Sequence, residues 1–295
     1  MRTWTGILFV AASAAGFGTL GILARYAYAD GLDALTILFV RFTLSAAAMA
    51  AVLAVRREQL PRGGALIRLA GMGAIGYVGQ AFTYFTAVKY ASPGLVGLLL
   101  YLYPTFVAIL SAVWLHEPMT RLKVLALGLA LAGTALTMGP AGGQFLGALF
   151  ALSAGAIYSV YIVVGAQVMK QVSAIQSSAV IFLAAGASSG LLMLWNGPHL
   201  PATTMGWAAL GAIVLLATLM PAVAFLAGIE RIGPTNAAMI STLEPVVTVV
   251  LSASLLGEML SPVSLLGGGL ILLAVLLLTV RVLRQPALVG PVASH

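Results

Sequence analysis

Two charged side chains lie inside long apolar stretches of the sequence, where a charge needs either water or a partner. Arg41 stands near the start of one stretch, in Leu38-Phe-Val-Arg-Phe-Thr, and Glu244 lies in the middle of another, in Ser241-Thr-Leu-Glu-Pro. Such a charge costs on the order of a few kcal/mol in hydrocarbon unless it is solvated or paired. Arg41 could contact a carboxylate, and Glu244 could bind an ammonium group or a proton. The alternative is a structural polar contact; it has equal weight for Glu244, and it is favoured for Arg41, which could extend toward the membrane interface.

A second set of candidate substrate contacts combines aromatic rings with polar atoms. Its members are Tyr77, Gln80, Tyr84, Tyr101, Tyr103, Tyr158 and Tyr161. The spacing of Tyr77, Gln80 and Tyr84 places them on one face of a helix, and Tyr158 and Tyr161 share a face in the same way. Tyrosine and glutamine in the middle of a membrane indicate a wet cavity, and aromatic rings suit an apolar or aromatic substrate. Gln80 is the strongest member, because a buried amide needs partners.

Other chemistries have little to work with. The chain has no cysteine and only three histidines, which are far apart in sequence, so we expect no metal site and no cofactor. It contains neither a Gly-x-x-x-x-Gly-Lys-Ser/Thr phosphate loop nor a His-Glu-x-x-His pattern. No histidine stands in a membrane stretch to support a Ser–His–Asp triad. We therefore predict no catalytic residues and no enzyme activity.

The composition identifies the solvent that surrounds this chain. Apolar residues make up 61% of the 295 residues and charged residues only 7%, whereas soluble domains carry about 25% charged residues. A chain so poor in charge can be covered by lipid but not by water. The lipid bilayer is therefore the first expected partner.

Ten apolar stretches approach or exceed the roughly 20 residues that a helix needs to cross a bilayer. They predict an all-α polytopic membrane protein with spans at Trp4–Tyr26, Ala34–Val55, Leu66–Val88, Pro93–Leu115, Leu122–Met138, Phe145–Gln167, Ala174–Trp195, Met205–Gly228, Thr235–Leu256 and Pro262–Val282.

The net charge of +7 follows the pattern of a membrane topology signal. With the N-terminus in the cytoplasm, the cytoplasmic segments hold Arg2, Arg56, Arg57, Arg62, Arg68, Arg121, Lys123, Lys170, Arg231, Arg281 and Arg284. The opposite side holds only Arg25 and Lys89. We therefore predict a multi-pass protein of the inner (plasma) membrane with both termini cytoplasmic, and no nucleic-acid partner.

The sequence repeats itself at a constant offset. Pro93, Pro104 and Glu117 recur as Pro234, Pro245 and Glu258, and the differences 234−93, 245−104 and 258−117 are all 141. Proline and glutamate are scarce inside spans, so their coincidence indicates a duplication. The predicted units are a first five-helix repeat over residues 1–139, a second over residues 140–285, and a C-terminal tail over residues 286–295. Because five is odd, the second repeat is inverted, an architecture typical of secondary transporters.

Four prolines at matched positions are candidate hinges: Pro93, Pro104, Pro234 and Pro245. Proline removes a backbone donor and breaks or begins a helix. The alternative is dense packing without motion. Because Pro104 and Pro245 occupy the same place in both repeats, a gating hinge is favoured for this pair.

The motifs around these prolines resemble a known family. Ala-Ser-Pro93-Gly, Leu-Tyr-Pro104 and Trp-Leu-His-Glu117-Pro resemble the first EamA domain of the drug/metabolite transporter superfamily, and Thr-Leu-Glu244-Pro245 with Leu-Leu-Gly-Glu258 resembles the second. The resemblance extends to about Arg284. Leu98-Leu-Leu-Tyr-Leu-Tyr-Pro104 is similar to the amino-acid and metabolite exporter branch, including the YddG-type exporters of aromatic and other neutral amino acids.

The leading hypothesis is a secondary transporter of small metabolites that works by alternating access, and most specifically an exporter of aromatic or neutral amino acids. One alternative is export of cationic drugs or another metabolite, with Glu244 as the partner of the cation. A second alternative, from a different class, is a pore or a membrane scaffold. The sequence leaves the direction of transport, ion coupling and oligomeric state open.

Overall fold

The computed structural model describes residues 2–90, 99–138, 145–256 and 262–284, and all of its regular elements are helical. The first half comprises α1 (Arg2–Gly18), α2 (Leu20–Ala29), α3 (Ala34–Arg56), α4 (Gly64–Gly71), the π-helical turn η1 (Met72–Tyr77), α5 (Val78–Tyr90), α7 (Tyr103–Trp114) and α8 (Arg121–Met138). The second half comprises α9 (Phe145–Val168), α10 (Ala174–Asn196), α11 (Thr204–Val214), the π-helical turn η2 (Leu215–Leu219), α12 (Met220–Ile232), α13 (Pro234–Ile240), the 3₁₀ turn η3 (Ser241–Leu243), α14 (Glu244–Leu256) and α15 (Pro262–Arg284).

These elements join end to end into ten rods that confirm the predicted all-α polytopic fold. Six of the rods are individually long and apolar enough to cross a membrane: Thr3–Ala29, Ala34–Arg56, Gly64–Tyr84, Phe145–Val168, Ala174–Leu194 and Thr204–Ile232. The described parts of the fourth and tenth spans include shorter apolar helices, Tyr103–Trp114 and Leu265–Leu278. Pro93 and Glu258 lie outside the described residues.

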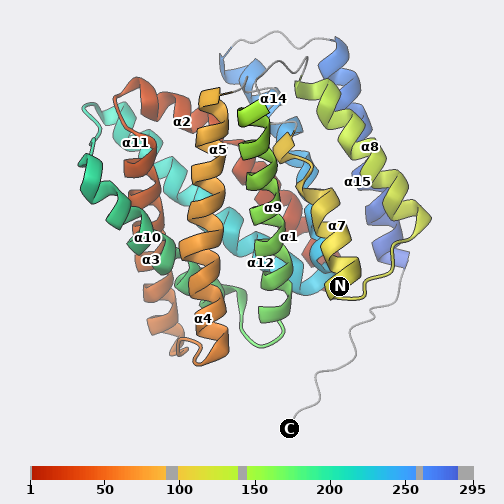
Figure 1. The fold of residues 1–295 in the computed structure, drawn as a ribbon, viewed down its shortest axis with the longest axis horizontal. Helices are drawn as coiled ribbons and strands as arrows, with labels where there is room; N and C mark the ends of the chain where they lie inside the picture. The colour runs from red at the N-terminus through yellow and green to blue at the C-terminus, as the bar shows by residue number, and fades with distance from the viewer. Residues whose placement is uncertain (1, 91–98, 139–144, 257–261, 285–295) are drawn as a thin grey trace.

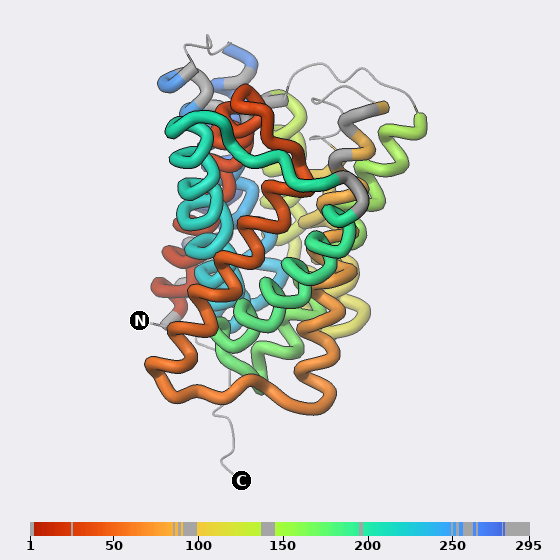
Figure 2. Tube along the Cα trace, turned by 90° about the vertical axis from the view of Figure 1, so that its left-hand side faces the viewer, coloured from red at the N-terminus to blue at the C-terminus, as the bar shows by residue number. Residues whose placement is uncertain are grey.

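The rods alternate in direction, and the second half begins at the opposite end from the first. In Figure 1, α3 descends, α4 and α5 ascend, and the chain continues in the same alternation to α15. Figure 2 shows the N-terminus near the lower end of the molecule, whereas α9 starts at the upper end. Five rods in each half therefore give the inverted arrangement that the repeat predicts.

The largest helix–helix contacts join one half to the other. α1 packs against α12 and α5 packs against α9. α1 and α9 lie in the first rod of their halves, and α5 and α12 lie in the third. Each of the two pairs therefore joins the first rod of one half to the third rod of the other. α3 with α10, α7 with α13, and α8 with α15 each pair a rod with its own repeat counterpart. This pattern is that of a two-fold axis between the halves.

Polar caps fix the turns at the ends of these helices. Asp33 accepts a hydrogen bond from the backbone N–H of Thr36 (2.9 Å) and begins α3. Ser173 and Gln176 form a reciprocal capping box at the start of α10. The Gln176 side chain also donates to the carbonyl of Gln59 (2.8 Å). That bond ties the α3–α4 turn to the second half.

Two departures from regular α-helix were not predicted from the sequence. The first span breaks at Thr19, whose hydroxyl donates to the carbonyl of Gly16 (2.7 Å). The third span of each half contains a π-helical turn, and Met72–Tyr77 shifted by 141 residues gives 213–218, which overlaps η2 at Leu215–Leu219. Thr218 compensates within η2 by donating to the carbonyl of Ile213 (2.8 Å). Turns of this kind are frequent at functional sites.

Glycine brings the halves into close contact at η1. A Cβ added to Gly73 would collide with the backbone carbonyl of Ile181 and would approach Ala184 Cβ to 3.0 Å. η1 therefore lies directly on the backbone of α10, and this contact fixes the position of Tyr77 in the same turn.

Candidate substrate site

The candidate site lies at two points where a helix is interrupted, and these two points are equivalent in the repeats. α7 begins at Tyr103-Pro104 and α14 begins at Glu244-Pro245, and 244−103 is again 141. Proline fits the first turn of a helix, where no backbone donor is needed. Tyr103 and Glu244 thus occupy the same position in the two halves, and the pair interacts electrostatically across the seam. The hinge role of these prolines stays a prediction.

Five tyrosines from both halves form one connected group, which we call the tyrosine cluster: Tyr77, Tyr101, Tyr103, Tyr158 and Tyr161. Ring centroids are 5.5 Å apart for Tyr77 and Tyr161, 5.8 Å for Tyr161 and Tyr158, 4.9 Å for Tyr158 and Tyr103, and 6.2 Å for Tyr103 and Tyr101. These separations are those of favourable aromatic pairs. The spacing in the sequence predicts only that Tyr77 shares a helical face with Tyr84 and Tyr158 shares one with Tyr161, and the fold brings the two faces together.

Hydrogen bonds to backbone hold Tyr103 at the centre of this cluster. The Ser159 hydroxyl on α9 lies between two carbonyl acceptors, that of Gly155 on its own helix (2.6 Å) and that of Tyr103 (3.1 Å). The Tyr103 hydroxyl donates to the carbonyl of Ala238 on α13 (3.4 Å). The cluster is therefore anchored to three helices from both halves.

Glu244 borders the tyrosine cluster. Its carboxylate accepts a hydrogen bond from the Tyr101 hydroxyl and interacts electrostatically with Tyr77 and Tyr158. Protein surrounds it deeply, yet the side chain keeps intermediate accessible surface, and the same is true of Tyr158. Glu244 and Tyr158 are thus partly accessible, and contact of either side chain with a substrate stays a prediction. None of the described residues forms an ion pair with Glu244.

Arg41 is enclosed by the protein. Only 7% of the residue is exposed, and its Nε has no hydrogen-bond partner. The guanidinium carbon lies 4.5 Å from the centroid of Phe42 and 5.8 Å from that of Tyr77. The guanidinium is therefore packed against aromatic rings, and both the structural and the substrate-binding role of Arg41 stay predictions.

Tyr84 and Gln80 stand on the turns of α5 that follow Tyr77. Both are partly accessible. Tyr84 interacts electrostatically with Glu244, which extends the site toward the end of α5. No described residue hydrogen-bonds the Gln80 amide, so its polar atoms are available to a ligand or to water.

Sequence reasoning missed two phenylalanines that complete the aromatic wall. Phe42 contacts Tyr77 edge-on, with centroids 5.0 Å apart, and Phe225 stacks on Tyr158 at 6.4 Å. The repeat contained a signal for one of them, because 225−84 is 141 and Phe225 is the counterpart of Tyr84. Phe42 had no such signal beyond its position next to Arg41.

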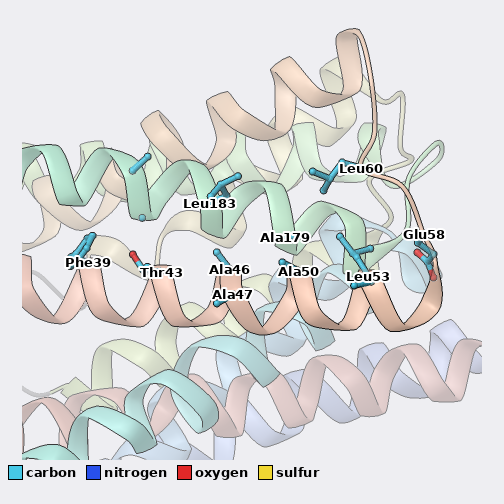
Figure 3. Close-up of a pocket in the computed structure, with 13 residues that line it drawn as sticks. Phe39, Thr43, Ala46, Ala47, Ala50, Leu53, Glu58, Leu60, Ala179 and Leu183 are labelled. Carbon is cyan, nitrogen blue, oxygen red and sulfur yellow. The ribbon is translucent and has the colours of Figure 1, made fainter.

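A lateral groove between α3 and α10 is separate from this site. It encloses about 660 Å³ and is lined mostly by small or apolar side chains, among them Phe39, Ala46, Leu53 and Leu183, with Glu58 at one end (Figure 3). Apart from Glu58 and Thr43, it offers no polar group that could recognise a small metabolite. The tyrosine cluster remains the better candidate.

Comparison with known proteins agrees with this architecture. Residues 4–139 and 145–280 each match the EamA-like transporter family. The uncharacterized transporter YcbK of Bacillus subtilis is 26% identical over 281 residues, covering 90% of this chain and 89% of its own. A probable terminal-alkyne amino-acid exporter of Streptantibioticus cattleyicolor is 27% identical over 269 residues, covering 87% of each chain.

The fold is also found in a crystal structure. That chain is 23% identical in sequence and superposes with a TM-score of 0.82, over 95% of this chain and 98% of its own. At this identity the likeness establishes the arrangement of helices alone.

Proposed function

Because the chain belongs to the EamA-like transporter family, we propose that it is a secondary transporter that exports neutral or aromatic amino acids by alternating access. The observation that carries the proposal is the tyrosine cluster with Glu244, located where the two inverted halves meet. In inverted-repeat transporters the substrate binds at this seam near the membrane midplane. The amino-acid exporter among its relatives supports the same substrate class.

Two features of the site suit an amino acid. The rings of Tyr158 and Phe225 provide an apolar wall for a neutral or aromatic side chain. Glu244, which has no cationic partner among the described residues, supplies a carboxylate for the ammonium group. A charge-assisted hydrogen bond of this kind contributes about 1.5–3 kcal/mol.

The repeat suggests how the site opens to each side. The proposed repeats are residues 1–139 and 140–285, and each contains one of the two matched hinges, at Tyr103-Pro104 and at Glu244-Pro245. Because the two units have the same fold in opposite orientation, exchanging their conformations turns an inward-facing site into an outward-facing one.

The charges at the two ends indicate the orientation in the plasma membrane. The turn between α3 and α4, at the lower end in Figure 2, carries Arg56, Arg57 and Arg62. The opposite end carries Asp30 and Asp33 in the α2–α3 turn. By the positive-inside rule the arginine end is cytoplasmic, and α1 begins and α15 ends at that same end (Figure 1).

Purified protein in liposomes tests the proposal directly. Vesicles loaded with phenylalanine or threonine should take up labelled phenylalanine by counterflow, saturably and only when protein is present. Saturable counterflow also distinguishes a carrier from a simple pore. Absence of protein-dependent flux for every amino acid tried would refute the amino-acid proposal.

Export of an organic cation remains the second candidate, and the unpaired carboxylate of Glu244 favours it. In that case wild-type vesicles should transport a lipophilic cation, and Glu244→Gln should abolish the transport. If the substrate is an amino acid, the cation should not be transported, and Glu244→Gln should raise the apparent KM for phenylalanine about 10- to 150-fold. Arg56→Gln, at an exposed position on the cytoplasmic end, is the control.

A further inference from the structure

Arg41 is a buried cation that forms no ion pair within the part of the chain that the structure describes. It makes no ion pair or hydrogen bond with any described residue, and its Nε is fully enclosed. Its guanidinium lies over the rings of Phe42 and Tyr77 and also interacts electrostatically with Tyr28. Rings attract a desolvated guanidinium, but they do not replace the hydrogen bond that its Nε–H loses on leaving water. Buried groups in this condition call for a missing partner.

The repeat shows that the fold itself does not require this charge. The counterpart of Arg41 in the second half is Phe182, since 182−41 is 141. Phe182 is fully buried and stacks on Phe42, 6.2 Å away, so an apolar ring packs well at this position. In the same way Glu244 has the neutral Tyr103 as its counterpart. The first half thus carries an embedded positive charge, Arg41, and the second half an embedded negative charge, Glu244. Neither charge has a charged counterpart in the other half.

Both charges lie within electrostatic range of Tyr77. Tyr77 interacts electrostatically with both Arg41 and Glu244, whereas the two charged groups form no ion pair with each other. They are therefore held apart beside the same aromatic wall, one positive and one negative.

We propose that Arg41 is the carboxylate-binding group of the transport site, so that the protein selects substrates bearing a carboxylate and rejects the corresponding amines. This inference rests on the proposed amino-acid transport and adds the residue that determines its specificity. The guanidinium supplies several donors in a fixed plane, which suit a carboxylate better than a point charge does. Together with Glu244 it makes the site selective for a zwitterion.

The first experiment uses the unmodified protein. Phenylalanine counterflow in liposomes is inhibited with unlabelled phenylalanine and with phenethylamine, which has the same ring and ammonium group but no carboxylate. We expect phenethylamine to be at least about tenfold weaker, since a charge-assisted hydrogen bond is lost. Equal inhibition by the two compounds would overturn the proposal without affecting the finding that phenylalanine is transported.

The second experiment assigns the discrimination to Arg41. In Arg41→Gln the inhibition ratio of phenylalanine to phenethylamine should fall toward one, mainly through weaker phenylalanine inhibition. Arg41→Lys keeps the charge but loses the planar fork, so it should retain part of the ratio. A merely structural role would lower the amount of active protein and leave the ratio unchanged, which would refute the inference.

Two controls keep the outcomes distinct. Arg56→Gln removes an exposed arginine, with 57% of its side chain accessible, and should keep the wild-type ratio. If Arg41→Gln does not yield folded protein, the Arg41→Lys ratio decides: a ratio between one and the wild-type value supports the proposal, and the full wild-type ratio refutes it. A resident chloride at Arg41 would instead make wild-type transport depend on chloride and leave the inhibition ratio intact in Arg41→Gln, and that result would also overturn it.

Discussion

Replacing Gly73 by alanine tests the contact that positions Tyr77. The added methyl group would meet the carbonyl of Ile181, a backbone atom of α10, and Ala184 Cβ at 3.0 Å. Backbone cannot move aside as a flexible side chain does, so the overpacking should cost about 1–3 kcal/mol.

Gly71, two residues earlier, is the matched control. Nothing lies within 4 Å of a Cβ added to Gly71. Both substitutions gain about the same 0.5–1 kcal/mol that alanine contributes over glycine in a helix. The difference between Gly73→Ala and Gly71→Ala therefore isolates the packing cost, and we expect it to be about 1–3 kcal/mol in favour of Gly71→Ala.

Unfolding of both variants in detergent by SDS titration and by heat measures this difference. With roughly 2–4 °C for each kcal/mol, the thermal midpoint of Gly73→Ala should lie several degrees below that of Gly71→Ala. Transport should fall further in Gly73→Ala, because the displaced turn carries Tyr77. Equal stability of the two variants would refute the close packing of η1 on α10.

Two further predictions concern the ends of the molecule. The backbone N–H of Thr203 donates to the Asp30 carboxylate (3.0 Å) and lowers the pKa of Asp30. The contribution of this hydrogen bond to folding stability is therefore present above the ordinary aspartate pKa of about 4. It is lost as the pH falls through the lowered pKa. Asp30→Asn should therefore have a lower thermal midpoint than wild type at pH 6, and the gap should close in strong acid; a gap independent of pH would contradict the assignment. Because the chain has no cysteine, an impermeant maleimide should label Ala202→Cys in intact cells and Arg62→Cys only after permeabilisation, and the reverse pattern would refute the proposed orientation.

Hydropathy and the repeat were sufficient to predict the rods and their inversion. Ala34, for example, begins α3 as predicted, because an aspartate cap immediately precedes the apolar run. The break at Thr19 and the π-helical turns were missed because composition determines which residues enter the membrane but not the hydrogen-bond register within a span. That register depends on packing against the other half, as at Gly73.

The sequence was sufficient to name candidate site residues but not to predict how they are arranged in space. Spacing placed Tyr77 near Gln80 and Tyr158 near Tyr161, since each pair lies on one helix. It could not join the pairs, because Tyr77 and Tyr161 come from different halves and meet only through the fold. For Arg41 the sequence shows a long side chain near the end of a span but not the direction in which it points. The fold packs it against the rings of Phe42 and Tyr77.

The pairing of helices across the seam also bears on how the protein is made. Since the main neighbours of α1, α3, α5 and α8 all belong to the second half, the first half emerges from the ribosome without the surfaces it packs against. Its helices must therefore remain in the bilayer with lipid in place of these neighbours until α12 and α15 are inserted. The arrangement is equivalent to an antiparallel homodimer whose two chains have been fused, and two halves synthesised separately, one in each orientation, should still find each other.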